Sequence, residues 1–258
     1  MARLARAVRR SGPRLPSGWP DLLRQLLLFA CAYYLYRLVR GIVDGDAGSA
    51  FEHARQLIHV ESSLGLFFEP GVQDWAQHQS WLMTAANFMY VNSHFAITMI
   101  FLGWLYLARN HAFYFVRNMF MVAMGLALVL YVVYPTAPPR FMPEWGFSDT
   151  VARFVGPAAE NSAALLYNPY AAVPSMHVAF AFMVGVPAAM LVRPLALKLL
   201  WSVYPLVVSF VVVITGNHFW LDAALGAAVA ATSAWAAAAA FARARPEAWA
   251  WRTAKVPA

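Results

Sequence analysis

The chain has 258 residues, of which 61% are hydrophobic and 12% are charged, and it carries a formal net charge of +7. An ordinary soluble domain carries about 25% charged residues. Here, apolar stretches near the ~18-residue length of a membrane span recur along the chain. The composition excludes an ordinary soluble domain and predicts an all-α integral membrane protein. The single cysteine, Cys31, excludes an intramolecular disulfide.

The first part of the chain changes from basic to apolar to polar. Residues 1–20 are rich in Arg, Pro and Gly, and we expect them to be disordered. A first span is expected over residues 22–43. Residues 49–65 then carry apolar side chains at helical spacing, namely Phe51, Ala54, Leu57 and Ile58. This spacing predicts a helix that lies at the membrane interface before the second span.

Five further spans are expected in the rest of the chain, at residues 81–107, 112–134, 175–192, 195–215 and 219–242. The third span ends at residues 134–140, which contain three prolines, because proline cannot continue a helix. Residues 141–172 are expected to form a long polar and aromatic loop. The prediction is one domain of six transmembrane helices over residues 21–242, followed by a basic cytoplasmic tail at 243–258.

The placement of charge predicts the orientation of these spans. With the N-terminus in the cytoplasm, 14 of the 19 basic residues fall on the cytoplasmic side, and ten of the twelve acidic residues fall outside. The cytoplasmic basic residues are Arg3, Arg6, Arg9, Arg10, Arg14, Arg24, Arg109, Arg117, Arg193, Lys198, Arg243, Arg245, Arg252 and Lys255. This positive-inside pattern places both termini in the cytoplasm. It also assigns the basic charge to orientation and anionic lipid, not to nucleic acid.

Three ionisable residues stand in the most apolar half of the chain, each beside a predicted helix end. They are His177, His218 and Asp222. Ionisable groups inside membrane segments are costly, so they usually have a function or a dedicated partner. The predicted topology brings all three, together with the proline-rich segment at 134–140, to the outer face of the membrane.

These segments have properties that suit phosphate chemistry. Pro174 suits the first turn of a helix, and the free backbone N–H groups that follow it, together with the Ser175 hydroxyl, form an anion site. Arg140 offers a planar guanidinium for phosphate oxygens. His218 and Asp222 are four residues apart, so Asp222 can fix the imidazole tautomer and leave the other nitrogen free as a nucleophile.

Other interpretations of these residues exist. A histidine in a membrane helix is often an interhelical hydrogen-bonding group, and Asp222 can act as a charge at a helix N-terminus. Two histidines and an aspartate can also bind zinc. The chain has no His-Glu-x-x-His motif and no further ligand cluster, which argues against zinc.

The sequence Pro174-Ser175-Met176-His177, followed by His218-x-x-x-Asp222, resembles two signatures of the type 2 phosphatidic acid phosphatase (PAP2) superfamily. Three longer segments, residues 134–140, 167–170 and 215–222, are similar to the branch that contains inositol phosphorylceramide synthases. The resemblance implies a bundle of six helices and a metal-independent enzyme with no cofactor. It further implies that a phosphoryl group passes through a phosphohistidine.

Carried over by position, the resemblance makes His218 the nucleophile, Asp222 its partner, His177 the general acid and Ser175 a phosphate contact. Two basic positions of the family signatures are missing here. Val212 stands six residues before His218, where an arginine is usual, and Val133 stands seven residues before Arg140, where a lysine is usual. We therefore expect Arg140 to anchor the phosphate, assisted by Asn217 and the Ser175 turn.

Three further residues are candidates for the substrate site. Asn168 and Tyr170 suit the headgroup pocket or a loop-structuring role, and His94 suits the cavity wall or an interhelical hydrogen bond. Arg117 is assigned to the cytoplasmic side and not to the site.

The sequence predicts an enzyme of the plasma (inner) membrane whose active site opens on the extracytoplasmic face. Its partners would be the bilayer and a lipid phosphate or phospholipid substrate, with water or an alcohol as acceptor. The alternative is a non-catalytic lipid-binding or transport protein that keeps the same bundle.

Overall fold

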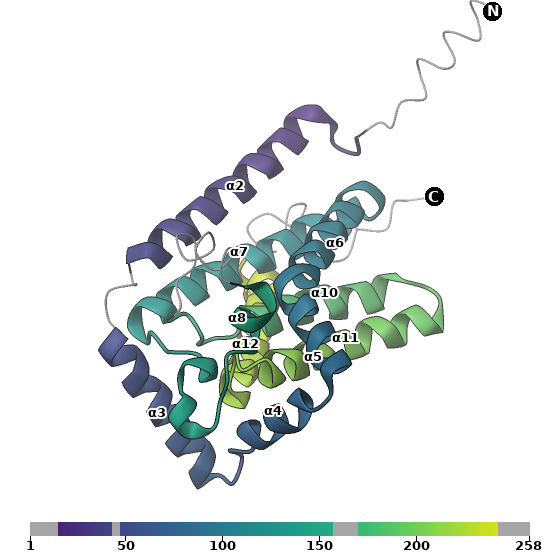
Figure 1. Ribbon diagram of the computed structural model, residues 1–258. Coiled ribbons are helices and arrows are strands. Elements are labelled where there is room, and N and C mark those ends of the chain that lie inside the picture. The colour runs from purple at the N-terminus through teal and green to yellow at the C-terminus, as the bar shows by residue number, and fades with distance from the viewer. Residues whose placement is uncertain (1–14, 43–46, 157–169, 242–258) are drawn as a thin grey trace, which may run out of the picture.

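The computed structural model describes residues 15–42, 47–156 and 170–241. Within these ranges the chain is helical, and its only β pairing is an isolated parallel bridge between Thr136 and Ala171. The longer helices are α2 (Gly18–Ile42), α3 (Ala47–Ser63), α4 (Glu69–Gln77), α5 (Ser80–Phe88), α6 (His94–Ala108), α7 (Asn110–Val133), α10 (Met176–Leu191), α11 (Leu195–Ile214) and α12 (Trp220–Ala236). Figure 1 shows α7 and α12 near the centre, α10 and α11 running side by side towards the right edge, and α2 along the opposite, upper left side.

Short helical segments complete the described chain. The π-helical turn η2 (Met89–Ser93) joins α5 to α6, and a second one, η5 (Ala237–Phe241), extends α12. Residues 141–172, expected to be a loop, contain the short helices η4 (Pro143–Trp145) and α8 (Thr150–Val155), and η3 (Pro139–Phe141) precedes them. The tail at 243–258 lies outside the described residues.

Four helices in the described chain are long and apolar enough to cross a membrane: Ser80–Ala108, Asn110–Val133, Leu195–Ile214 and Trp220–Ala239. They match four of the six predicted spans. α10 is apolar but has 16 residues, so it is about 24 Å long against a hydrocarbon core of about 30 Å. α2 is not among the four helices that are long and apolar enough either, so six spans are not confirmed. α2 also begins at Gly18, inside the stretch expected to be disordered.

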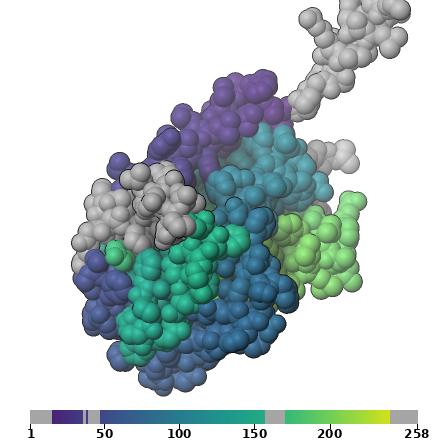
Figure 2. Space-filling view, viewed as in Figure 1, coloured from purple at the N-terminus to yellow at the C-terminus, as the bar shows by residue number. Residues whose placement is uncertain are grey.

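The helix predicted at 49–65 is confirmed as α3, although a position at the membrane interface is not. Its buried face includes Ala50, Ala54, Leu57 and Ile58, which pack with Met142, Phe147, Val173 and Phe219. α3 therefore covers the starts of the central helices. Figure 2 shows the segment around α8 filling the surface between α3 and the α4–α5 region.

Two glycines set how closely the central helices approach. A Cβ on Gly185 of α10 would lie 2.6 Å from the carbonyl oxygen of Trp201 on α11. A Cβ on Gly226 of α12 would lie 2.3 Å from the carbonyl oxygen of Ser175, at the start of α10. Real Cβ atoms do not come this close to backbone, so only glycine fits at both crossings. The crossing at Gly226 brings the starts of α10 and α12 together.

Candidate active site

The N-termini of α10 and α12 are joined directly by their backbones. The N–H of Ser175, the N-cap residue of α10, donates to the carbonyl oxygen of Asp222 in the first turn of α12 at 3.0 Å. The hydroxyl of Tyr131, from α7, donates to the carbonyl oxygen of Pro174 at 3.2 Å. Two segments more than forty residues apart in sequence are thereby held in a fixed relation.

The three ionisable residues singled out in the sequence meet at this junction. His218 lies just before α12, and its Nδ1 is 3.2 Å from Oδ2 of Asp222. Both side chains are buried, with Asp222 fully so. The ring of His177, in the first turn of α10, lies 5.8 Å from the ring of His218 between centroids. Because Asp222 engages Nδ1 of His218, Nε2 is left as the nitrogen that can act on a substrate.

A second group of rings lies behind His177. Tyr90, in the π-helical turn η2, stacks on His177 at 4.4 Å, and the ring of His94 lies 5.0 Å from it. The hydroxyl of Tyr204, from α11, is 3.2 Å from Nδ1 of His94. His94 thus makes an interhelical hydrogen bond and stands beside His177, while its role as a substrate residue stays a prediction. A π-helical turn often marks a functional site.

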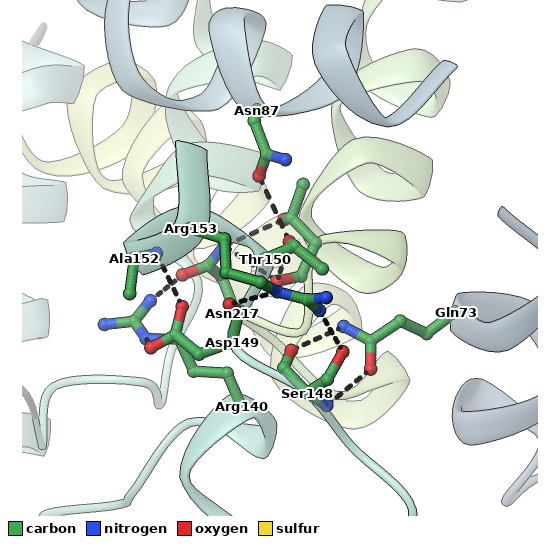
Figure 3. Close-up of polar contacts among 10 residues, drawn as sticks. Gln73, Asn87, Arg140, Ser148, Asp149, Thr150, Ala152, Arg153 and Asn217 are labelled. Atoms are coloured by element: carbon green, nitrogen blue, oxygen red, sulfur yellow. Dashed lines mark hydrogen bonds and ion pairs between the residues drawn. The ribbon is translucent and has the colours of Figure 1, made fainter. Parts of the chain in front are cut away.

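Arg140 reaches the same centre through Asn217, the residue before His218 (Figure 3). Its Nη1 donates to Oδ1 of Asn217, its Nε lies 3.3 Å from Oδ2 of Asp149, and its backbone N–H donates to the carbonyl oxygen of Gly216. Gly216 has φ of +69°, which favours glycine. Arg140 is buried, and it is held on two sides before any ligand binds.

Polar side chains from α4 and α5 support this loop from outside (Figure 3). Gln73 of α4 exchanges two hydrogen bonds with the backbone of Ser148, each of 3.0 Å. The hydroxyl of Thr150 lies 3.2 Å from Oδ1 of Asn87 and 3.2 Å from the carbonyl oxygen of Thr215. The segment that carries Asp149 is thereby fixed against the loop that carries His218.

Val212, near the end of α11, stands at the position where the family signature usually has an arginine. Val212 is fully buried, and its carbonyl oxygen accepts from the N–H groups of Asn217 and His218 at 3.0 and 3.1 Å. A valine there contributes core packing and the shape of the loop, without charge. The guanidinium of Arg140 contacts this loop through Asn217.

The expected anion site at Ser175 differs in detail from the sequence prediction. α10 begins at Met176, so Pro174 precedes the N-cap and does not stand in the first turn. The N–H of Ser175 is taken by Asp222, and its hydroxyl accepts from the N–H of Val178 at 3.4 Å as a helix cap. Ser175 still stands at the N-terminus of α10, where the helix dipole favours an anion.

The remaining candidates make other contacts or lie outside the described residues. Tyr170 accepts the N–H of Thr136 with its carbonyl oxygen, and its ring packs against Phe51 of α3 at 6.0 Å. These contacts match the loop-structuring role. Asn168 lies outside the described residues. Arg117 donates to Gln25 of α2 at 2.7 Å and to the neighbouring Asn118. Its place on the cytoplasmic side stays a prediction.

A cavity of about 230 Å³ opens beside His177, with His94 and Tyr90 in its wall. The rest of its lining is mainly apolar and comes from α2, α6, α7 and α10. A second cavity of about 360 Å³ lies along α2, α6 and α7. Four residues line both cavities: Phe29, Met99, Phe120 and Met124. We call the two together the apolar groove.

Sequence reasoning missed two buried acids near the site, Glu61 and Glu69. Each accepts a hydrogen bond from a backbone N–H at the start of α12, Glu61 from Leu221 and Glu69 from Trp220. A signal for Glu61 was present, because it continues the apolar face of α3 that includes Ala54 and Ile58. Among the described residues, no group of three or more His, Cys, Asp or Glu side chains could hold a metal ion.

The fold and the site define a class: a helical membrane protein with two facing histidines, one of them oriented by a buried aspartate, beside an arginine. The sequence model of the PAP2 superfamily matches residues 55–236, and the chain belongs to this superfamily. No curated protein and no solved structure matches it. PAP2 proteins are generally phosphatases or phosphotransferases, and membership together with four apolar helices indicates a membrane protein with a phosphatase-type activity.

Proposed function

We propose that this protein is a metal-independent lipid phosphatase or phosphotransferase that works through a phosphohistidine on His218. The observation that carries the proposal is the arrangement of His218, Asp222 and His177. The first two are hydrogen-bonded at 3.2 Å, and the centroids of the two imidazole rings lie 5.8 Å apart. One imidazole is oriented as a nucleophile and a second stands within reach of the same substrate, as a two-step transfer requires.

In the first step, Nε2 of His218 attacks phosphorus. A phosphorus–nitrogen bond forms, and the bond between phosphorus and the leaving oxygen breaks. His177 gives its proton to that oxygen. Asp222 accepts the hydrogen bond of the Nδ1 proton, so it stabilises the positive charge that develops on the imidazole.

In the second step, an oxygen nucleophile takes the phosphoryl group from His218. His177, now without its proton, acts as base towards the attacking hydroxyl. Water as acceptor gives hydrolysis and inorganic phosphate. A lipid alcohol gives transfer of a phospho-headgroup, the outcome that resemblance to the inositol phosphorylceramide synthase branch favours.

The charge on the transferred phosphoryl oxygens needs stabilisation throughout. We assign it to Arg140, with Asn217 and the N-terminus of α10 beside it. The contact between Arg140 and Asp149 at 3.3 Å fixes the guanidinium before substrate binds. Electrostatic stabilisation is most effective when the charges need no reorganisation during the reaction.

The apolar groove supports a lipid as the substrate. It begins beside His177, where the phosphate would lie, and continues between α2, α6 and α7. An apolar chain bound there would leave its polar head at the histidines. We therefore place the hydrocarbon tail in the groove and the phosphate between His177 and His218.

We further propose that the site opens on the extracytoplasmic side of the plasma (inner) membrane. Basic residues away from the site support this, because Arg109 and Arg193 lie at the α6–α7 and α10–α11 connections and Lys198 lies in the first turn of α11. To test it, Cys31→Ala protein would receive Glu144→Cys or Arg193→Cys, both at exposed positions. An impermeant thiol reagent added to whole cells should label only Glu144→Cys; labelling of only Arg193→Cys would reverse the orientation.

The central test uses purified protein with a panel of phospholipids and isoprenoid phosphates, recording both free phosphate and new lipid products. A labelled phosphate should also be trapped on the protein as an acid-labile adduct, and His218→Ala should prevent trapping. Activity should persist in chelator. If wild-type protein binds lipid phosphates but neither turns them over nor becomes labelled, the non-catalytic alternative is correct.

A further inference from the structure

Two glutamates far from α12 in sequence cap its first turn. Oε1 of Glu69 accepts the N–H of Trp220 at 3.2 Å, and Oε1 of Glu61 accepts the N–H of Leu221 at 2.9 Å. These are the first two residues of α12, whose N–H groups have no partner within the helix. The N-cap residue, Phe219, offers no side-chain cap. The capping that a local Ser or Asp usually provides therefore comes from α3 and α4.

Both glutamates are fully buried, as is Asp222, which follows Leu221 directly. The Glu61 and Glu69 carboxylates accept from adjacent N–H groups, and Oε2 of each has no hydrogen-bond partner among the described residues. Two ionised carboxylates buried at neighbouring positions would repel each other and leave both Oε2 atoms without a donor. One proton on the pair removes one of the two charges and supplies a donor.

The electrostatic environment of Glu61 also favours one proton on the pair. Burial, the hydrogen bond that protonated Glu61 can donate to Glu69, and the negative charges of Glu69 and Asp222 raise the pKa of Glu61 to about 9. The groups that face Glu61 are Glu69 from α4, Asp222 from α12 and, through Asp222, His218. With one shared proton the two glutamates carry a single negative charge, which the N-terminus of α12 stabilises.

We propose that Glu61 and Glu69 form a proton-sharing acid pair that holds the start of α12, and thereby positions Asp222 and His218 for the reaction. Neither glutamate touches the reacting atoms, so both are positioning residues. The effect on catalysis rests on the proposed function. The sharing of the proton does not, and it can be tested on its own.

The catalytic test compares Glu61→Gln, Glu61→Ala and, as control, Glu52→Gln, an exposed residue of the same helix. Glutamine reproduces the protonated acid, since it can accept from Leu221 and donate to Glu69. At neutral pH, Glu61→Gln should have the same kcat as wild type. As the pH rises through about 9, the kcat of wild type should fall, whereas that of Glu61→Gln should not. Glu61→Ala should lower kcat about tenfold or more with little change in KM, because the histidines lose their alignment.

The second test measures thermal unfolding of the same proteins in detergent. Glu61 holds its proton in the folded state up to a pKa of about 9, against an ordinary value of 4.5. The folded protein then binds more protons than the unfolded chain across that window, so stability falls as the pH rises through it. Glu61→Gln should show a smaller fall between about pH 5 and pH 9 than wild type, and Glu52→Gln the same fall.

The two tests separate the two proposals. If wild type turns over no lipid phosphate, the proposed function fails, and the unfolding comparison still decides whether the proton is shared. If wild type is active but Glu61→Ala keeps its kcat, the positioning role is wrong and the function stands. Equal pH dependence of unfolding in wild type and Glu61→Gln overturns the acid pair in either case.

Discussion

The two regions that meet at His177 are built in opposite ways. On one side, hydrogen bonds from α3, α4 and α5 hold the start of α12 and the segment around α8, and Arg140, Asn217, His218 and Asp222 are buried. On the other side, the apolar groove is lined by phenylalanine, leucine and methionine side chains from α2, α6 and α7.

The difference matches two different tasks. Phosphoryl transfer requires fixed geometry and fixed charges, which a connected polar network supplies. A hydrocarbon tail requires apolar area and tolerance of shape, which flexible side chains such as Met99 and Met124 supply. Substitutions in the polar region should therefore lower the rate of the chemical step, whereas substitutions in the groove should alter which lipids are preferred.

The largest effect is expected from Asp222→Asn. Asparagine fits the space but cannot stabilise the charged imidazole or enforce its tautomer, so kcat should fall by about 10³–10⁴-fold, the scale found when a catalytic histidine loses its orienting carboxylate. Steady-state turnover of a short-chain lipid phosphate would measure it. Asp74→Asn, at an exposed position of α4, is the control. Near-normal turnover in Asp222→Asn would contradict the role of the polar region.

A smaller loss is expected from Arg140→Lys. Lysine keeps the charge but lacks the planar group that contacts Asn217 and Asp149 together. We expect kcat/KM to fall by about 10²-fold, the usual cost of removing one oriented donor from a developing negative charge. Arg153→Lys tests an arginine of the same network that does not contact Asn217. Equal losses in both variants would show that the network acts only as scaffold.

The two regions also differ in how much of their structure could be predicted from the sequence. Four spans, α3 and the meeting of His177, His218 and Asp222 were predicted, because apolar periodicity and charge counting report local helix formation and membrane side. The short helices between residues 139 and 155 were missed, since few residues define each of them. α10 was assigned a full span because its composition is apolar, although it has only 16 residues.

Partners in space were the hardest part to predict. Asp149, Gln73 and Glu69 stand in polar stretches where their side chains read as surface residues. Gln73 and Glu69 are buried and Asp149 is half-buried, because loops fold back over the starts of α10 and α12. Tertiary contacts of this kind leave no local pattern. Only Glu61 left a signal, as an acid on the apolar face of α3.

The smallest effect, and the sharpest test of the groove, is expected from Gly103→Phe. Gly103 lines the groove on α6, and a Cβ there would meet nothing within 4 Å, so a larger side chain fills space that a tail would use. At about 0.8 kcal/mol for each methylene, displacing two methylenes should raise KM for long-chain substrates about tenfold and leave short-chain substrates unchanged. Gly125→Phe, at a helical glycine with equally open surroundings outside the groove, is the matched control. If both variants changed long-chain and short-chain KM alike, the tail would bind elsewhere, and the polar region alone would define the substrate site.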